Sequence, residues 1–237
     1  MPTVTRTEVF DRLAIVGKAF SSARRLEIID LLSQGERTVE AIARATGLGV
    51  STASAHLQVL KGAHLVTTRR DGTRIHYRLA GDDVAALYSG LGAVARNRSA
   101  DVERARVGYL GGSGAPDVEE VTREELAERL ALGAVTVLDV RPHEEYLAGH
   151  IPGALSVPFG DLPARVATLE PSSDVVAYCR GAYCVMASDA VRLLRAEGRR
   201  ATRLEDGLLE WRVAGFPVET AEPRDRATAT ALAGADA

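Results

Sequence analysis

The chain has 237 residues and a net charge of −3, with 46% hydrophobic and 26% charged residues, which is the usage of an ordinary folded protein. No apolar run approaches the ~18 to 20 residues that a membrane-spanning helix needs, and charges interrupt the N-terminal segment where a signal peptide needs an apolar core. We therefore expect a cytoplasmic protein that makes no membrane contact.

Glycine and proline mark a boundary between two periodic regions of the chain. The boundary residues are Gly111, Gly112, Ser113, Gly114 and Pro116. We predict domains over 1–110 and 118–219, a flexible linker over 111–117 and a disordered tail over 220–237. Up to residue 110 the chain carries 16 Lys and Arg against 11 Asp and Glu (+5), and beyond it 13 against 21 (−8). This difference suggests that only the first domain meets a polyanion.

The first region has the period of amphipathic helices over 8–20 and 22–35. Two short helices follow, within TVEAIARATG and LGVSTASAHLQVLKGAHLV, separated by Gly47, Leu48 and Gly49; this is the spacing of a helix-turn-helix motif. Apolar residues of the second short helix are predicted to face inward: Ala53, Leu57 and Leu60. Its outward face is small and polar: Ser51, Thr52, Ala55 and Gln58.

A basic hairpin and a long helix complete the first region. TTRRDGTRIHYRL predicts two strands around a two-residue turn at Asp71 and Gly72. Alternation places Ile75, Tyr77 and Leu79 on one face and Arg74, His76 and Arg78 on the other. The apolar stripe of the helix predicted over 82–110 is too long for so small a domain to cover, so we expect dimerisation through it.

The segment STASAHLQVLKGAHLVTTRRDGTRIHYRL resembles the ArsR/SmtB family of winged helix-turn-helix repressors over roughly residues 8–110. The resemblance implies a homodimer, through helix 82–110, on palindromic double-stranded operator DNA. It assigns DNA contacts to Ser51, Thr52, Ser54, Ala55, His56, Gln58, Lys61, Arg69, Arg70, Arg74 and Arg78. His64 stands where the family usually has glycine. The cysteine, aspartate and histidine ligands of the metal-sensing members are absent, so no metal is expected.

The second region holds both cysteines, in AYCRGAYC. Apolar strands at AVTVLDV and DVVAYC alternate with helices, which predicts a parallel α/β sheet. Cys179 then lies at the carboxyl end of a strand and at the entrance to a helix, where the sites of such sheets gather. A loop from Cys179 to Cys184 can point its backbone N–H groups inward, so we expect the pKa of Cys179 to lie below the usual value of about 8.5.

Three ordered motifs in the second region resemble the rhodanese family over residues 118–219: LDVRPHEEYLAGHIPGALSVP, YCRGAYC and EDGLLEWRVAGFPV. The resemblance implies that Cys179 accepts sulfur and that Asp139 and Arg141 brace the loop. The loop itself consists of Arg180, Gly181, Ala182, Tyr183 and Cys184. Val185 stands where related phosphatases and arsenate reductases need arginine, which argues against those activities. Cys184 is a departure from many family members, and our hypothesis is that it resolves a persulfide on Cys179, giving either a disulfide or a sulfur-bridged link and releasing sulfide.

Together these motifs predict a two-domain fold: a mainly α-helical winged helix-turn-helix domain with a long dimerisation helix, and an α/β rhodanese domain with a mostly parallel sheet. The leading interpretation is a repressor that senses or transfers reactive sulfur from thiosulfate, polysulfide or a low-molecular-weight persulfide, with no cofactor. An active thiosulfate-type sulfurtransferase with autoregulatory DNA binding is the alternative. A metal- or arsenite-responsive repressor is weaker, because two thiols fall short of the usual ligand number.

Overall fold

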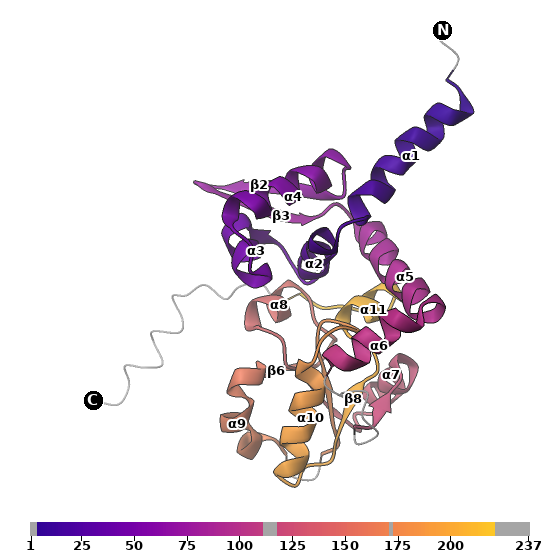
Figure 1. The fold of residues 1–237 in the computed structure, drawn as a ribbon. Helices are drawn as coiled ribbons and strands as arrows, with labels where there is room; N and C mark the ends of the chain where they lie inside the picture. The colour runs from indigo at the N-terminus through magenta and orange to yellow at the C-terminus, as the bar shows by residue number, and fades with distance from the viewer. Residues whose placement is uncertain (1–3, 111–117, 171–172, 221–237) are drawn as a thin grey trace.

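The computed structural model describes residues 4–110, 118–170 and 173–220. It contains the two predicted domains, one above the other in Figure 1, with a mainly helical N-terminal domain and an α/β C-terminal domain. The predicted linker over 111–117 lies outside the described residues, as does all but the first residue of the predicted tail. Among the residues that are described, none of the helices combines the length and apolarity needed to cross a bilayer.

The N-terminal domain packs its helices around one core and adds a small antiparallel sheet. Its elements are α1 (Arg6–Phe20), α2 (Ala23–Leu32), β1 (Arg37–Thr38), α3 (Val39–Thr46), α4 (Val50–Gly62), β2 (Val66–Asp71), β3 (Arg74–Leu79), α5 (Asp82–Arg98) and α6 (Ala100–Tyr109). Thr38 caps α3 and the left-handed Gly47 ends it, which turns the chain into α4. The inward face predicted for α4 is confirmed, because Ala53, Leu57 and Leu60 are fully buried.

Two local predictions in this domain are wrong. Asp71 pairs with Arg74, so the hairpin loop consists of Gly72 and Thr73, and of these only Gly72 has a positive φ. The helix predicted over 82–110 is interrupted at Ser99, which has extended backbone and accepts a hydrogen bond from the N–H of Val102. A serine side chain that caps the first turn of a new helix competes with continuation of the preceding helix. The periodicity of apolar residues does not reveal this competition. The sheet also includes β1, which the sequence did not indicate and which pairs with β3.

The turn after α4 is preserved although histidine replaces the glycine expected there. His64 has φ of 59° and is the only non-glycine residue with positive φ among the described residues. A β-branched side chain fits this backbone poorly, so His64→Val should lower the free energy of unfolding by about 1–2 kcal/mol. His64→Gly should be at least as stable as the wild type. Urea denaturation followed by circular dichroism tests this, and equal stabilities of the two variants would contradict it.

The C-terminal domain is a parallel five-stranded sheet of order β4-β8-β7-β5-β6, as predicted, with helices on both faces. Its elements are β4 (Glu120–Val121), α7 (Arg123–Ala131), β5 (Thr136–Asp139), α8 (His143–Ala148), β6 (Leu155–Ser156), η1 (Phe159–Asp161), α9 (Leu162–Arg165), η2 (Val166–Thr168), β7 (Val175–Tyr178), α10 (Met186–Ala196), β8 (Ala201–Leu204) and α11 (Leu208–Val213). Side chains of α9 and α10 pack on one face and those of α7 and α11 on the other. Every residue of β7 is therefore buried.

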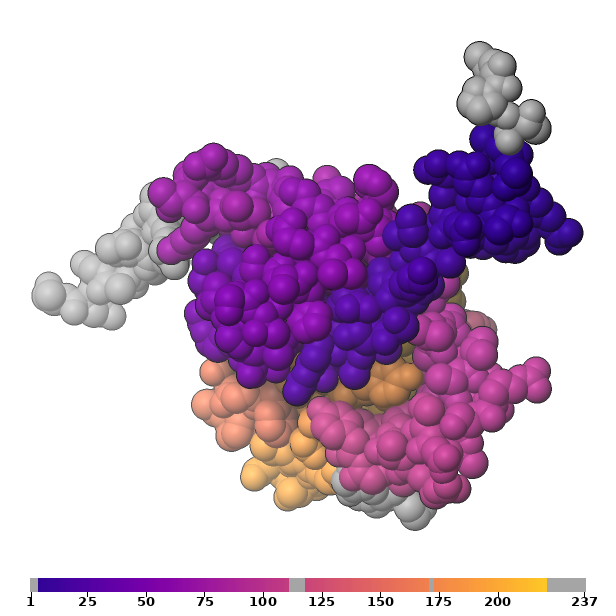
Figure 2. All heavy atoms as spheres, turned by 45° about the horizontal axis from the view of Figure 1, so that its top comes forward, coloured from indigo at the N-terminus to yellow at the C-terminus, as the bar shows by residue number. Residues whose placement is uncertain are grey.

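The two domains are docked against each other. The α5 helix of the N-terminal domain packs on α11 of the C-terminal domain. Gly35, in the turn after α2, approaches α8 so closely that a Cβ placed on it would lie 2.8 Å from the Cβ of Ala148. In contrast, the N-terminal part of α1 stands away from the rest of the molecule (Figure 2). The docking brings the N-terminal domain to the carboxyl ends of the parallel strands, where the cysteine loop lies.

Candidate functional site

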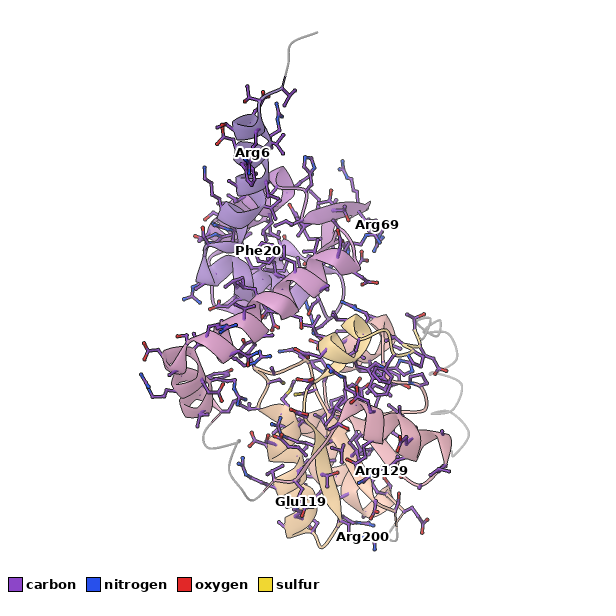
Figure 3. All side chains as sticks on the ribbon, turned by 90° about the vertical axis from the view of Figure 1, so that its right-hand side faces the viewer. Arg6, Phe20, Arg69, Glu119, Arg129 and Arg200 are labelled. Carbon is purple, nitrogen blue, oxygen red and sulfur yellow. The ribbon has the colours of Figure 1, made fainter. Side chains whose placement is uncertain are left out.

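The residues predicted to contact DNA lie on α4 and on the β2–β3 hairpin. Ser54 and His56 are partly buried, and the others are exposed: Ser51, Thr52, Ala55, Gln58, Lys61, Arg69, Arg70, Arg74 and Arg78. Arg69, labelled on the hairpin in Figure 3, forms an ion pair with Glu36, and this hydrogen bond lowers the pKa of the Glu36 carboxyl. A DNA phosphate at Arg69 would therefore have to compete with a carboxylate that already occupies the guanidinium.

Cys179 follows β7 directly, and its side chain faces the protein interior, with the residue only 1% exposed. Its Sγ donates to the carbonyl oxygen of Cys184 at 3.5 Å, and the N–H of Cys184 donates to the carbonyl of Gly181 at 3.1 Å. These bonds curl residues 179–184 into a closed loop at the start of α10. The two thiols predicted to act together are thus brought together, with Cys184 the more accessible of the two.

The charge distribution between the thiols differs from the prediction. Burial raises the pKa of Cys179 well above its usual range, although the N–H groups of Ala187 and Gly181 act in the opposite direction. The hydrogen bond from Cys179 lowers the pKa of Cys184 to about 7, with help from the N–H groups of Arg180 and Met186 and from the positive charge of Arg180. The prediction of a lowered pKa at Cys179 is wrong in this closed loop, because desolvation outweighs the backbone dipoles.

Alkylation of the two thiols should therefore follow different pH profiles. The thiolate is the reactive form, so the rate at Cys184 should rise with pH through a midpoint of about 7, while Cys179 stays slow. Cys179→Ala removes the donor and should move the Cys184 midpoint up toward the usual value of about 8.5. Mass spectrometry after timed iodoacetamide pulses measures both sites, and a wild-type Cys184 midpoint already near the usual value would disprove this assignment.

The other two residues predicted for the site, Asp139 and Arg141, form a buried ion pair at the end of β5. Asp139 also accepts a hydrogen bond from the Tyr178 hydroxyl at 2.7 Å. Beyond Asp139, Arg141 donates to the carbonyl of Gly149 at 2.7 Å and to the side chain of Gln34 at 3.1 Å. Gln34 in turn donates to the carbonyl of Arg180 at 3.3 Å. Through Gln34, a residue of the N-terminal domain, Arg141 is therefore connected to the backbone of the loop.

The start of α11 lies directly against the loop. The N–H groups of Leu208 and Leu209 donate to the carbonyls of Cys179 and Arg180 at 3.0 and 3.1 Å. A Cβ placed on Gly207 would lie 2.3 Å from the nitrogen of Gly181, so only glycine permits this approach. The Glu210 carboxyl lies beside the loop as well, and burial raises its pKa to about 7. This packing explains why EDGLLEW belongs to the site.

Sequence reasoning missed Glu145, which is 1% exposed and pairs with Arg180 of the loop and with Arg37 of the N-terminal domain. It also missed Arg96 on α5, which donates to the hydroxyl of Tyr183 at 3.1 Å. The partners Arg37 and Glu145 are 108 positions apart. No periodic or short-range signal in a single sequence identifies such a pair, whereas the loop itself is visible as a motif.

Comparisons with known proteins agree with this two-part organisation. Residues 22–68 match the family described as bacterial regulatory protein, arsR family, and residues 122–214 match the rhodanese-like domain. The HTH-type transcriptional regulator Rv0324 of Mycobacterium tuberculosis is 54% identical over 218 residues, covering 92% of this chain and 95% of that protein. A sulfurtransferase of Allochromatium vinosum is 32% identical over 106 residues, covering 44% of this chain and 98% of that protein.

Two solved structures match one domain each. The solution structure of a homodimeric winged helix-turn-helix DNA-binding domain from Mycobacterium bovis is 51% identical, covers 41% of this chain and 93% of that one, and has a TM-score of 0.38. The crystal structure of a rhodanese-related protein from Thermoplasma volcanium is 28% identical, covers 43% of this chain and 97% of that one, and has a TM-score of 0.39. Since the similarity to the Mycobacterium tuberculosis regulator runs through both domains, the chain belongs to the ArsR-type winged helix-turn-helix transcriptional regulators that carry a C-terminal rhodanese domain.

Proposed function

We propose that this DNA-binding regulator is a homodimeric repressor whose operator affinity changes when the loop at Cys179 takes up reactive sulfur. One observation carries the proposal: a loop with two adjacent thiols, whose pKa values are shifted in opposite directions, lies against the DNA-binding domain. A change in the charge or shape of that loop therefore alters its contacts with the domain that contains α4. The small sulfur species that fit are polysulfide, thiosulfate and low-molecular-weight persulfides.

An uncovered apolar groove supports the dimer. The groove has a volume of about 530 Å³ and is lined by residues of α1 and α5: Phe10, Leu13, Ala14, Val16, Gly17, Phe20, Leu87 and Leu91. Leu13 is 62% exposed and Val94, further along α5, is 61% exposed. Exposed side chains of this size favour association, and a two-fold dimer covers the same face of both copies. The proposed interface therefore uses α1 with α5, rather than one continuous helix over 82–110.

The proposed chemistry begins with the transfer of a proton from the Cys179 thiol to the Cys184 thiolate. The Cys184 thiolate takes the proton of Cys179 while the Cys179 sulfur attacks the outer sulfur of a persulfide R–S–SH, which forms Cys179–S–SH and releases the thiolate R–S⁻. After Cys184 ionises again, its sulfur attacks the inner sulfur of Cys179–S–SH. This forms a Cys179–Cys184 disulfide and releases HS⁻. Two electrons pass from the cysteine pair to the sulfane sulfur, which leaves as sulfide.

A gel-shift series tests the proposal. Double-stranded DNA selected from a random library with the wild-type protein serves as the operator, and sodium polysulfide serves as the sulfur donor. We expect the donor to change the Kd of the wild type by about tenfold or more, equivalent to about 1.4 kcal/mol, and to leave Cys179→Ser unchanged. Cys184→Ser, which keeps the acceptor but not the resolving thiol, should retain the persulfide without forming a disulfide. Equal affinities with and without donor in the wild type would reject sulfur control.

A second candidate is an active sulfurtransferase that uses DNA binding for autoregulation. The parallel sheet with Cys179 at the end of β7 favours it, as does the similarity to the Allochromatium vinosum sulfurtransferase over that protein's whole length. The burial of Cys179 argues for slow turnover. Formation of thiocyanate from thiosulfate and cyanide, lost in Cys179→Ser, would favour this candidate. Uptake of one sulfur atom per protein chain without further turnover would favour the sulfur-sensing repressor.

A further inference from the structure

We propose that the sulfur site is a two-domain site, in which Gln34 and Arg37 of the DNA-binding domain are positioning residues that hold the loop closed through Arg180. The inference deepens the proposed function, on which it rests only for the link to DNA. The geometry on which it stands consists of three groups of contacts between the N-terminal domain and the loop. Each comes from a different element of the DNA-binding domain.

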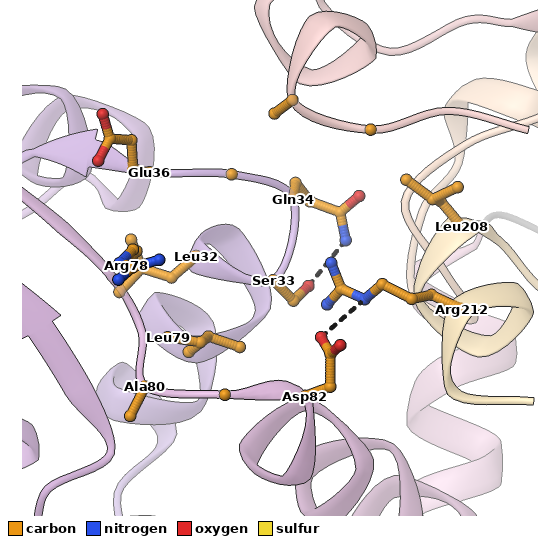
Figure 4. Close-up of a pocket in the computed structure, with 14 residues that line it drawn as sticks. Leu32, Ser33, Gln34, Glu36, Arg78, Leu79, Ala80, Asp82, Leu208 and Arg212 are labelled. Carbon is orange, nitrogen blue, oxygen red and sulfur yellow. Dashed lines mark hydrogen bonds and ion pairs between the residues drawn. The ribbon is translucent and has the colours of Figure 1, made fainter. Parts of the chain in front are cut away.

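The first contact is a hydrogen-bond bridge through Gln34, a buried residue in the turn after α2. Its amide donates to the carbonyl of Arg180, and its side-chain oxygen accepts from Arg141. Figure 4 shows Gln34 beside Ser33, facing Leu208 and Arg212 of the C-terminal domain across the pocket. The next residue, Gly35, has a φ of 144° and makes the close approach to Ala148. The turn is therefore shaped to lie against the loop.

The second contact is one buried carboxylate shared by two arginines. Arg180 donates to Glu145 through Nε at 2.9 Å and Nη2 at 2.7 Å, and Arg37 pairs with the same carboxylate. Burying a carboxylate that is 1% exposed destabilises the fold unless a positive charge pairs with it. Glu145 therefore holds both guanidinium groups close to its carboxylate. Arg37 belongs to β1, which leads into α3 and pairs with β3 at Tyr77. The loop thus connects through two side chains to the wing.

The third contact joins the loop to α5. Arg96 donates to the Tyr183 hydroxyl and lies 5.6 Å from the centroid of its ring. A Cβ placed on Gly92 would lie 2.9 Å from that hydroxyl oxygen, so Tyr183 packs against the helix backbone. The same helix carries Leu91 of the apolar groove. Any opening of the loop that moves Tyr183 therefore disturbs the helix assigned to the dimer.

Cys179 is packed among side chains of the parallel sheet and α10, and the interdomain contacts hold the loop closed over it. A sulfur donor can reach the Cys179 sulfur only if the loop opens, and opening breaks the bonds to Gln34 and Glu145. Because coupling between two sites is reciprocal, loosening the DNA-binding domain must also favour the open loop. Other titratable groups near the loop include Asp30 on α2 and Glu210 on α11, and both have a raised pKa because they are buried. Arg203 and Asp206 lie near Ala182 of the loop, since all three line one pocket.

Alkylation of Cys179 in the full chain tests the inference. Arg37→Ala should raise the iodoacetamide rate at Cys179 about tenfold or more and bring its pH midpoint toward the usual value of about 8.5, because the thiol becomes hydrated. Arg37→Lys keeps the charge beside Glu145 and should restore most of the protection. Arg24→Ala, which removes an exposed ion pair with Glu27 in the same domain, is the matched control and should leave the rate unchanged.

Gly35→Val provides a second route, since it separates the domains without removing a charge, and it should also increase the rate at Cys179. Trp211 is the only tryptophan and is buried in the rhodanese core, so its fluorescence verifies that each variant is folded there. Wild-type protection of Cys179 in both folded variants, Arg37→Ala and Gly35→Val, would overturn the inference.

Failure of the inference and failure of the proposed function are distinguishable. If Cys179 becomes reactive in the variants while polysulfide leaves DNA affinity unchanged, the two-domain site stands and sulfur control of DNA binding fails. If polysulfide changes the DNA affinity while Cys179 stays protected in the variants, sulfur control stands and the positioning role of Arg37 fails.

Discussion

Asp139→Ala should destabilise the rhodanese domain by about 3–5 kcal/mol, the usual consequence of leaving a buried charge without its partner. Asp139 and Arg141 are both fully buried. The carboxylate accepts bonds from the backbone N–H and the guanidinium of Arg141 and from the Tyr178 hydroxyl. Truncation to alanine leaves the guanidinium of Arg141 and the hydroxyl of Tyr178 without this acceptor. Urea denaturation followed by the fluorescence of Trp211 measures the change.

Asp174→Ala is the matched control for this prediction. Asp174 is also in the C-terminal domain and pairs with Arg200, but its side chain is 48% exposed and that of Arg200 is 74% exposed. Water screens such a pair, so its loss should lower the free energy of unfolding by less than about 1 kcal/mol. If Asp139→Ala proves no more destabilising than this control, the buried ion pair does not hold the end of β5 together.

Leu91→Glu should convert the proposed dimer into a monomer and weaken operator binding by about 100-fold or more, since the palindromic site expected for such a dimer is then held by one copy at a time. Leu91 is 40% exposed and lines the groove between α1 and α5. Burying a side chain of this size contributes about 1.5–3 kcal/mol to the free energy of association. In a two-fold dimer the same side chain of both copies is buried, so the contribution is made twice. A carboxylate in each copy adds an unpaired charge at that interface. Analytical ultracentrifugation and gel shifts provide the two measurements.

Leu132→Glu makes the same chemical change on the rhodanese domain, at a leucine that is 81% exposed just beyond α7. It should leave both the oligomeric state and the DNA affinity unchanged. A Leu91→Glu protein that sediments as a dimer would place the interface elsewhere, and the groove between α1 and α5 would then need another occupant.

Much of the architecture is predictable because local patterns report which side of an element is apolar. The spacing of Ala53, Leu57 and Leu60 correctly predicted the buried face of α4, and the apolar runs AVTVLDV and DVVAYC correctly predicted parallel strands. Prediction failed where local competition decides the outcome. Ser99 interrupts the helix and the hairpin turn is shifted by one residue, since a single cap or pairing register outweighs periodicity there. The domain boundaries and the roles of the site residues stay predictions.

The amino-acid sequence by itself determined the two fold classes, the place of the two thiols after a buried strand, and the basic wing. Only the tertiary structure decided which thiol has the lowered pKa and which N-terminal residues contact the loop. The physical reason is that a pKa depends on desolvation and on charges nearby in space. Here Gln34 meets the carbonyl of Arg180 across 146 positions of the chain, and Arg37 meets Glu145 across 108, so the contacts around the loop depend on docking that periodicity does not encode.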